Sequence, residues 1–217
     1  DNQVPPGVVT GIWETPATMN RSWGFHIADT HWKSSQDMIR QLVDLTSKNV
    51  NYLLNIGPKA DGSIPVESVE SLNEIGEWIR VNGEAIYNTR PSPWYQEMDG
   101  FRITTANDAL YIILLDPEIK NITLFNLNND IIKIEGVNNG IKIPFEFQKI
   151  DTPVVSVLKI SIPAEMRDEP LRVIKVFIKG KPEVKDQPTQ MSTGNILLPA
   201  RMARVVKNEG ELQISGI

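Results

Sequence analysis

The sequence changes its pattern at Pro91-Ser92-Pro93, and no other feature constrains the fold as strongly. Before these residues, strand-like and helix-like segments alternate, as in parallel α/β structure, and after them only short β-like runs follow. A Pro-rich segment at such a change indicates a domain boundary. We therefore predict two parts, residues 1–94 and residues 95–217.

Two strands are predicted in the first part. Val8–Glu14 leads into a long polar loop, and Tyr52–Ile56 is short and almost wholly apolar. A strand of the second kind is usually covered on both faces, as in parallel sheets. Two parallel strands alone leave open sheet edges and apolar faces without partners. The first part is therefore expected to pack against further structure.

A helix is predicted after each of these strands. The first starts at a cap, Ser34 or Ser35, and reaches about Asn49, with apolar residues at helical spacing along one side. The second starts near Pro65, a residue suited to the first helical position, and is closed by Gly83. The order of elements in the first part is thus strand, helix, strand, helix.

The second part is predicted to be an antiparallel β-sandwich. Turn residues separate its strand candidates at about the 8–12-residue spacing of such folds. A long polar segment, residues 179–199, precedes the last two candidates. The candidates are Phe101–Thr105, Ala109–Leu115, Asn121–Leu127, Ile131–Ile134, Ile141–Phe147, Val154–Ile162, Leu171–Ile178, Met202–Val206 and Glu211–Ile214.

The composition argues against several classes of protein. The net charge of −5 disfavours a nucleic-acid partner or an anionic membrane surface, because both require a basic face. The longest apolar run, Leu110–Leu115, has the length of a strand and not of a membrane span. Cysteine is absent, so the chain has no disulfide, no thiolate zinc site and no cysteine nucleophile, and every compartment stays open.

Four segments of the first part, taken in order, resemble the α-L-fucosidases of glycoside hydrolase family 29. A helix pattern fills each expected gap between them, so the set is more specific than any one segment. The resemblance covers about residues 8–94, and the sandwich is consistent with the C-terminal domain of this family without a diagnostic motif. The segments are Trp13-Glu14-Thr15, Ser22-Trp23-Gly24-Phe25, Asn51–Pro58 with Asp61-Gly62, and Val81–Tyr87 continuing into Thr89-Arg90-Pro91.

The resemblance implies that residues 1–94 hold the last strands and helices of a (β/α)8 TIM-like barrel, whose chemistry lies at the C-terminal ends of its strands. It implies a retaining, exo-acting hydrolase of terminal α-L-fucosides on glycans, with no metal and no cofactor. The nucleophile and the acid/base fall at or upstream of residue 1. The chain alone is therefore expected to be inactive, and its partners are a fucosylated substrate and the missing N-terminal half of the barrel.

Three residues are candidates for the site. Glu14, at the end of its predicted strand, acts as the acid/base, orients that group, or is a structural Glu held by an Arg of the missing half. Trp23 matches the family position whose ring packs on the sugar, and the alternative is a loop Trp packed under Pro16 or Pro65. His26 is expected at the rim of the site or in solvent, as is His31. Their spacing, without a carboxylate partner, gives poor support for a metal site.

Two further expectations concern Asn51 and Asn55, which are more suited to bracing neighbouring strands than to binding sugar.

Other functions for the whole chain also stay open. One is a non-catalytic carbohydrate-binding or scaffold sandwich, although the second part has no Trp and its aromatic residues occupy core positions of strands. The other is one chain of a split glycosidase, whose other chain supplies the first strands.

Overall fold

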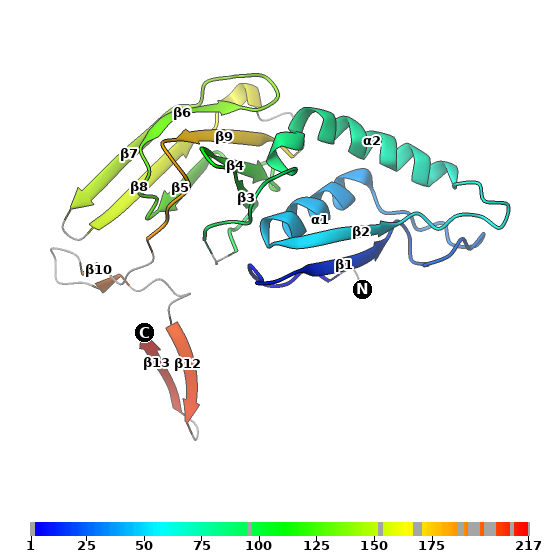
Figure 1. The fold of residues 1–217 in the computed structure, drawn as a ribbon, viewed down its shortest axis with the longest axis horizontal. Helices are drawn as coiled ribbons and strands as arrows, with labels where there is room; N and C mark the ends of the chain where they lie inside the picture. Colours follow the sequence, from blue (N-terminus) through cyan, green and yellow to red (C-terminus); the bar gives the residue numbers. More distant parts are fainter. Residues whose placement is uncertain are drawn as a thin grey trace.

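The computed structural model describes residues 3–94, 97–151, 154–166, 171–185, 189–190, 196–197, 203–208 and 211–216. A parallel strand pair flanked by two helices forms the first part, and antiparallel sheets form the second (Figure 1). Residues 95 and 96, at the predicted boundary, lie outside the described residues. Within the described residues, neither helix has the length and apolar composition that crossing a membrane requires.

The strand pair of the first part is β1 (Trp13–Thr18) with β2 (Val50–Asn55), in parallel register. The prediction for the first strand, Val8–Glu14, was five residues too early. Gly11 has a φ of +87°, which interrupts an extended segment, and the Asn49 side chain donates to the carbonyls of Val9 and Gly11 at 3.2 and 3.0 Å. The segment before β1 is therefore fixed by the end of the first helix and not by the sheet.

The helices are α1 (Ser35–Ser47) and α2 (Val66–Asn82), followed by the 3-10 turn η1 (Gly83–Ala85). The predicted cap is confirmed, since the Ser34 hydroxyl accepts a hydrogen bond from the Asp37 N–H at 3.1 Å. Gly83 is the C-cap of α2, as predicted, although it has a helical conformation with φ −60° and not the left-handed one that is common for a glycine in this place. An added Cβ there would meet the Tyr87 ring at 3.3 Å, so this glycine makes room for an aromatic side chain.

The second part contains a four-stranded and a three-stranded antiparallel sheet, with strand orders β3-β4-β9-β6 and β5-β8-β7. The predicted strand Ile141–Phe147 was wrong by four residues, because Pro144 cannot donate to a ladder and the strand begins after it. The strands are β3 (Phe101–Thr105), β4 (Ala109–Leu114), β5 (Asn121–Phe125), β6 (Ile131–Gly136), β7 (Phe145–Asp151), β8 (Val154–Ser161) and β9 (Val173–Ile178).

The remaining elements are short. The turn η2 (Ala164–Met166) precedes β9, and two antiparallel strand pairs follow β9. Part of the predicted polar segment, and residue 202 of a predicted strand, lie outside the described residues. The hairpin strands are β10 (Thr189–Gln190) with β11 (Ile196–Leu197), and β12 (Ala203–Asn208) with β13 (Glu211–Gly216).

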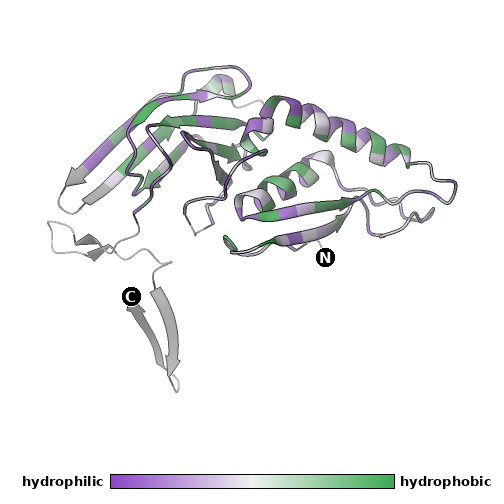
Figure 2. Cartoon of the chain, in the orientation of Figure 1, coloured by the Kyte–Doolittle hydropathy of each residue, from purple (hydrophilic) through white to green (hydrophobic). Residues whose placement is uncertain are grey.

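Strand β4 is buried along its whole length because it has two apolar neighbours. Leu110, Ile112 and Leu114 belong to the core between the two sheets. Alternate residues Tyr111 and Ile113 belong to a second core, together with residues of α1 and α2. Figure 2 shows mainly hydrophobic colours along β9, which pairs with β4 and is largely buried as well. The helices thus lie between the β1–β2 pair and the sandwich, and the two parts share a core.

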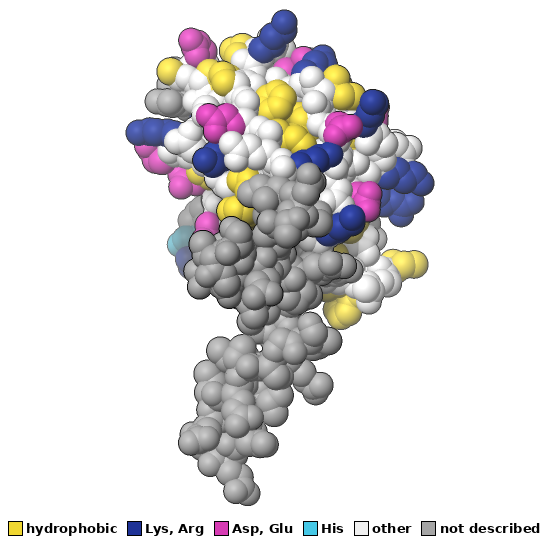
Figure 3. All heavy atoms as spheres, turned by 90° about the vertical axis from the view of Figure 1, so that its left-hand side faces the viewer, with side chains coloured by type: hydrophobic (Ala, Val, Ile, Leu, Met, Phe, Trp, Pro, Cys, Tyr) yellow, Lys and Arg dark blue, Asp and Glu magenta, His cyan; other side chains and the backbone are white. Residues whose placement is uncertain are grey.

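The opposite end of the sandwich is polar. In Figure 3, Lys and Arg side chains are interspersed with Asp and Glu over this end, with apolar groups scattered between them. Two of the ion pairs on this part of the chain are partly exposed, Lys133 with Glu135 at 2.7 Å and Lys149 with Asp130 at 2.7 Å. A mixed surface of this kind is typical of a solvated face.

Candidate functional site

The C-terminal ends of β1 and β2, at Thr18 and Asn55, form the end of the sheet from which the candidate site is built. On β2, Val50 is buried and Tyr52 donates from its hydroxyl to Gln41 of α1, so these residues face the helix. By alternation, Leu53 and Asn55 face the other way, where half of the Leu53 side chain is exposed. This face of the strand pair is therefore only partly covered.

The loop after β1 closes on itself before α1 begins. The Lys33 N–H donates to the Met19 carbonyl at 2.8 Å, and the Lys33 ammonium group donates to the Thr18 carbonyl at 2.6 Å. Between these ends the loop presents apolar side chains to solvent: Trp23 is 45% exposed and Phe25 is 39% exposed. A closed loop with exposed rings is suited to contact a ligand that has an apolar face.

Asp29 organises this loop from within. Its Oδ2 accepts hydrogen bonds from the Arg21 N–H at 3.0 Å and from the Ser22 hydroxyl at 2.7 Å, and its Oδ1 accepts from the His31 N–H at 3.2 Å. The Ser22 hydroxyl, and after it the backbone donors, lower the pKa of Asp29 from its ordinary value. Asp29 is therefore a charged acceptor for its own loop.

The loop after β2 supports the same segment from the other side. The Asn55 amide donates to the Trp23 carbonyl, so this residue braces the loop after β1 and not, as expected, a neighbouring strand. Gly57 has a φ of +54°, and a Cβ there would lie 3.6 Å from the backbone of Gly24. The Lys59 ammonium group lies 5.5 Å from the centre of the Phe25 ring. The two loops therefore form one surface.

The structure places two of the three predicted site residues together. Trp23 and His26 lie in the same loop, with His26 exposed and its carbonyl accepting from the Asp29 N–H at 2.9 Å. His31 is also largely exposed, and its Nδ1 lies 3.7 Å from Asp29. Exposure of both histidines is compatible with the rim of a site and with solvent alike, so the roles of Trp23, His26 and His31 stay predictions.

The placement of Glu14 at the catalytic end of its strand was wrong. Because β1 runs from Trp13 to Thr18, Glu14 is its second residue and pairs with Asn51 near the start of β2. At about 3.3 Å per residue it lies about 13 Å along the strand from Thr18. The argument for a catalytic Glu14 depended on the end of the strand, and the structure removes that argument.

The sequence did not single out Phe25, Asp29 or Lys59 as individual residues of this surface. Phe25 could have been found from the sequence, because it lies in the same segment as Trp23. The hydrogen bond between Asp29 and Ser22 could not, because it depends on how the loop folds. The carboxylates on the two loops are Asp29 and Asp61, and both accept hydrogen bonds within their own loop. Among the described residues, no three His, Asp or Glu side chains are grouped as a metal site requires.

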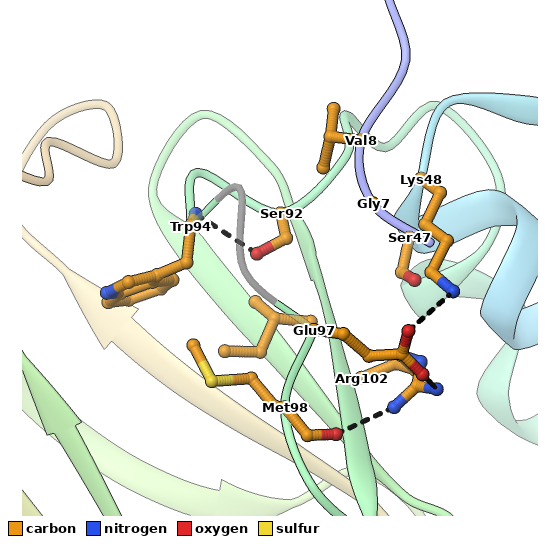
Figure 4. A pocket seen from close by; sticks show the side chains of 10 residues that line it. Gly7, Val8, Ser47, Lys48, Ser92, Trp94, Glu97, Met98 and Arg102 are labelled. Carbon is orange, nitrogen blue, oxygen red and sulfur yellow. Dashed lines mark hydrogen bonds and ion pairs between the residues drawn. The ribbon is translucent and has the colours of Figure 1, made fainter. Parts of the chain in front are cut away.

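A small cavity lies elsewhere, at the junction of the two parts. Lys48 at the end of α1, Trp94 and Arg102 of β3 are among the residues that line it (Figure 4). Its volume of about 20 Å³ has room for a water molecule and not for a sugar. A larger groove of about 380 Å³ lies at the start of β1 and β2, beside Trp13 and Tyr87, at the opposite end from the two loops.

Comparisons with known proteins find similarity to one family. The sequence model of the family described as "Alpha-L-fucosidase" matches residues 1–84. The α-L-fucosidase of Branchiostoma floridae is 38% identical over 128 residues, which are 55% of this chain and 28% of that protein. The plasma α-L-fucosidase of Homo sapiens is 36% identical over 51% of this chain and 23% of its own length. The matched part is thus about a quarter of these relatives.

Solved structures extend the similarity into the sandwich. α-L-Fucosidase isoenzyme 1 from Paenibacillus thiaminolyticus has a TM-score of 0.71 and 31% identity, covering 82% of this chain and 44% of that one. The α-L-fucosidase of Vibrio sp. strain EJY3 has a TM-score of 0.77 and 28% identity, covering 89% of this chain and 34% of that one. The sandwich is part of the match, because the shared fold extends far beyond residue 84. Residues 1–84 therefore match the α-L-fucosidase family model, and the chain is similar to a C-terminal part of those enzymes.

Proposed function

We propose that this chain contributes the last two strands and helices of the barrel, and the C-terminal sandwich, to an exo-acting, retaining hydrolase of terminal α-L-fucosides. The observation that carries the proposal is the joined surface of the two loops at the C-terminal ends of β1 and β2, which holds the exposed rings of Trp23 and Phe25. Barrel enzymes build their sites on such loops. A family member from Thermotoga maritima was solved in complex with fucose.

Trp23 is the proposed substrate contact. Fucose has a methyl group and apolar C–H faces, which an indole ring covers with little loss of conformational freedom. The ring is about half exposed although its main chain is fixed by Asn55. His26 lies in the same loop and is proposed to line the rim of the site.

The chemistry is proposed to come from outside this chain. Hydrolysis with retention of the anomeric configuration requires two carboxyl groups about 5–5.5 Å apart. One acts as the nucleophile, and the other acts first as the acid and then as the base. On the two loops, Asp29 and Asp61 are both engaged by neighbouring serines, and Glu14 lies at the other end of β1. The nucleophile and the acid/base therefore belong to other strands of the barrel, and the chain alone is expected to be inactive.

The partner is proposed to be the rest of the barrel. Leu53 on the inner face of β2, and Val66, Val69 and Leu72 on α2, expose apolar surface that neighbouring strands and helices of a closed barrel would cover. Apolar faces on both the sheet and the outer helix favour completion of a barrel over a free-standing module. The partner half belongs to the same or to a second chain.

A carbohydrate-binding role of the sandwich alone has less support. Among the described residues of the sandwich, the aromatic side chains that are more than a third exposed are Phe125 and Phe145. Phe145 pairs with the buried Ile160 and so faces the core, whereas Phe125 lies on the outer face. Two rings on opposite faces do not make a platform for a sugar.

The test compares the chain alone with the chain joined to the remaining barrel, on an aryl α-L-fucoside. We expect hydrolysis by the complete protein only. Proton NMR of the reaction should show α-fucose as the first product, as retention of the anomeric configuration requires, with β-fucose appearing later. Repurified chain that hydrolyses the fucoside by itself, and retains this in Glu14→Gln, would show that the catalytic carboxylates lie within residues 1–217. An inactive complete protein would contradict the fucosidase proposal.

A further inference from the structure

The Trp23 segment is fixed by contacts on two sides that come from different parts of the chain. From within the loop, Asp29 binds the backbone of Arg21 and the hydroxyl of Ser22, the two residues before Trp23. From the adjacent loop, Asn55 binds the carbonyl of Trp23 itself. The ring is exposed, but the main chain that carries it is tied on either side.

Asp29 differs from its neighbours in burial. Its side chain is 7% exposed, although most residues from Arg21 to Thr30 are exposed. Both carboxylate oxygens are occupied, by the three hydrogen bonds from Arg21, Ser22 and His31. A carboxylate that is covered and already accepts these bonds is poorly placed to transfer a proton to a substrate. It is well placed to stabilise the conformation of its loop.

Asp29 also spans the loop along the sequence. Its partners lie eight and seven residues before it and two residues after it, so a single side chain joins the start of the loop to the turn at His31. Charged acceptors make stronger hydrogen bonds than neutral ones. Loss of this carboxylate would therefore release residues 21–31 while the pairing of β1 with β2 and the helices stay in place.

We propose that Asp29 is a positioning residue for substrate binding, which holds the loop so that the Trp23 ring is presented to the sugar before the sugar arrives. The inference rests on the proposed fucosidase function, since it assumes that Trp23 meets the substrate. Preorganisation of a binding loop increases affinity, because the loop no longer has to be ordered when the ligand binds. The effect of Asp29 is thus expected in substrate binding and not in the chemical step.

The chain offers a matched control. Asp61, in the loop after β2, accepts from the Ser63 hydroxyl at 2.7 Å and the Ser63 N–H at 3.0 Å, the same kind of bonds that Asp29 makes. Both of these bonds lie within its own loop. Asp61→Asn therefore removes an equivalent charged turn without releasing the proposed binding loop.

The first experiment uses chain 1–217 and does not depend on activity. Amide hydrogen exchange of residues 20–31 is compared in wild type, Asp29→Ala, Asp29→Asn and Asp61→Asn. We expect exchange of this loop to become at least tenfold faster in Asp29→Ala and to be unchanged in Asp61→Asn, with α1 and β2 protected in both. Ser22→Ala removes only one of the three hydrogen bonds and should give a smaller increase in the exchange rate of the loop. It replaces Asp29→Ala in the comparison if that variant does not fold. Unchanged loop exchange in the Asp29 variants and in Ser22→Ala would overturn the inference.

The second experiment uses the complete enzyme on an aryl α-L-fucoside. We expect Asp29→Ala to raise KM roughly tenfold with kcat changed less than twofold, and Asp61→Asn to change neither. In a Trp23→Ala background, Asp29→Ala should add little to KM, because the two residues act through one contact. Additive effects on KM, or a fall in kcat alone, would overturn the positioning role. Wild-type enzyme without fucosidase activity would instead refute the proposed function, while the exchange result would still report on the loop.

Discussion

Arg102 of β3 and Asp44 of α1 form a partly buried ion pair across the junction between the strand–helix part and the sandwich. The arginine also donates to the carbonyls of Met98 and Phe101 at 2.7 and 2.9 Å. Lys48 completes the network, 2.9 Å from Asp44 and 3.2 Å from Glu97. Figure 4 shows the contacts of Lys48 and Arg102 with Glu97. Since positive and negative charges alternate in this network, each buried charge has an opposite neighbour.

Removal of Arg102 should therefore destabilise the whole chain. We expect Arg102→Ala to lower the free energy of unfolding by about 3 kcal/mol, at the low end of the range for breaking a buried pair because Lys48 still neutralises Asp44. Urea denaturation of chain 1–217 measures this. The control is Lys133→Ala, which removes an exposed pair with Glu135 and should cost less than about 1 kcal/mol. Equal costs for the two variants would show that the junction network does not stabilise the fold.

The shared core makes a second prediction, about the division at residues 94 and 95. On the face of the four-stranded sheet that meets the helices, Ala109, Tyr111, Ile113 and Val173 are buried, together with Leu171 just before β9. Residues 95–217 alone would expose this face. We expect that piece to keep β circular dichroism but to bind an apolar dye and to unfold at lower urea than the same sheets in chain 1–217. If the sandwich unfolds at the same urea concentration alone and within chain 1–217, it is an independent domain.

The order of elements was predictable from the sequence because each has a strong local signal. The cap at Ser34 and the apolar spacing after it are properties of residues a few positions apart. Strand ends were not predictable in the same way. Val8–Glu14 has the β-branched residues of a strand, but pairing with β2 selects Trp13–Thr18, and that choice depends on tertiary contacts.

The candidate site was only partly predictable for the same reason. Trp23 and Phe25 could be found because they lie together in one segment. Asp29 and Asn55 act on Trp23 through a folded loop and through a neighbouring strand, and no spacing in the sequence indicates either contact. The shift of β1 also moved Glu14 away from the end where it was expected.

The third prediction concerns pH. The hydrogen bond from Ser22, with the backbone donors, lowers the pKa of Asp29 in the folded loop. Because the charged form is the one that the fold favours, its contribution to loop order is complete above the unfolded pKa of about 3.9 and is lost as the pH falls through the lower, folded value. We expect the loop to stay closed from pH 7 to about pH 4 and to open below it.

Quenching of Trp23 fluorescence by acrylamide, obtained as the difference between wild type and Trp23→Phe, follows this opening. The His31 Nδ1 lies 3.7 Å from Asp29, so the measurement is repeated in His31→Asn to separate the contribution of the imidazole from that of the carboxylate. Asp29→Asn should have high quenching at every pH, because the amide supplies a single acceptor oxygen for three donors. A wild-type transition that persists in Asp29→Asn would assign the pH dependence to another group.

The last prediction concerns Trp23 in the complete enzyme. If its ring covers the apolar face or the methyl group of fucose, the contact contributes on the order of 1–3 kcal/mol by burial of apolar area. Trp23→Ala should then raise KM for an aryl fucoside by roughly tenfold or more, since about 1.4 kcal/mol corresponds to one decade. A contact that tightens as the sugar flattens toward its oxocarbenium-like transition state would also lower kcat.

Two further variants separate sugar binding from packing. Trp23→Phe should recover much of the loss, because covering the sugar requires a ring and not the indole N–H. Trp13→Ala removes an equally exposed indole at the other end of β1 and should leave KM unchanged. Thermal melts of all three variants identify any loss of folded enzyme. Kinetics close to wild type in a stably folded Trp23→Ala enzyme would exclude this ring from the site, whereas an equal rise in KM for Trp13→Ala would attribute the effect to barrel packing.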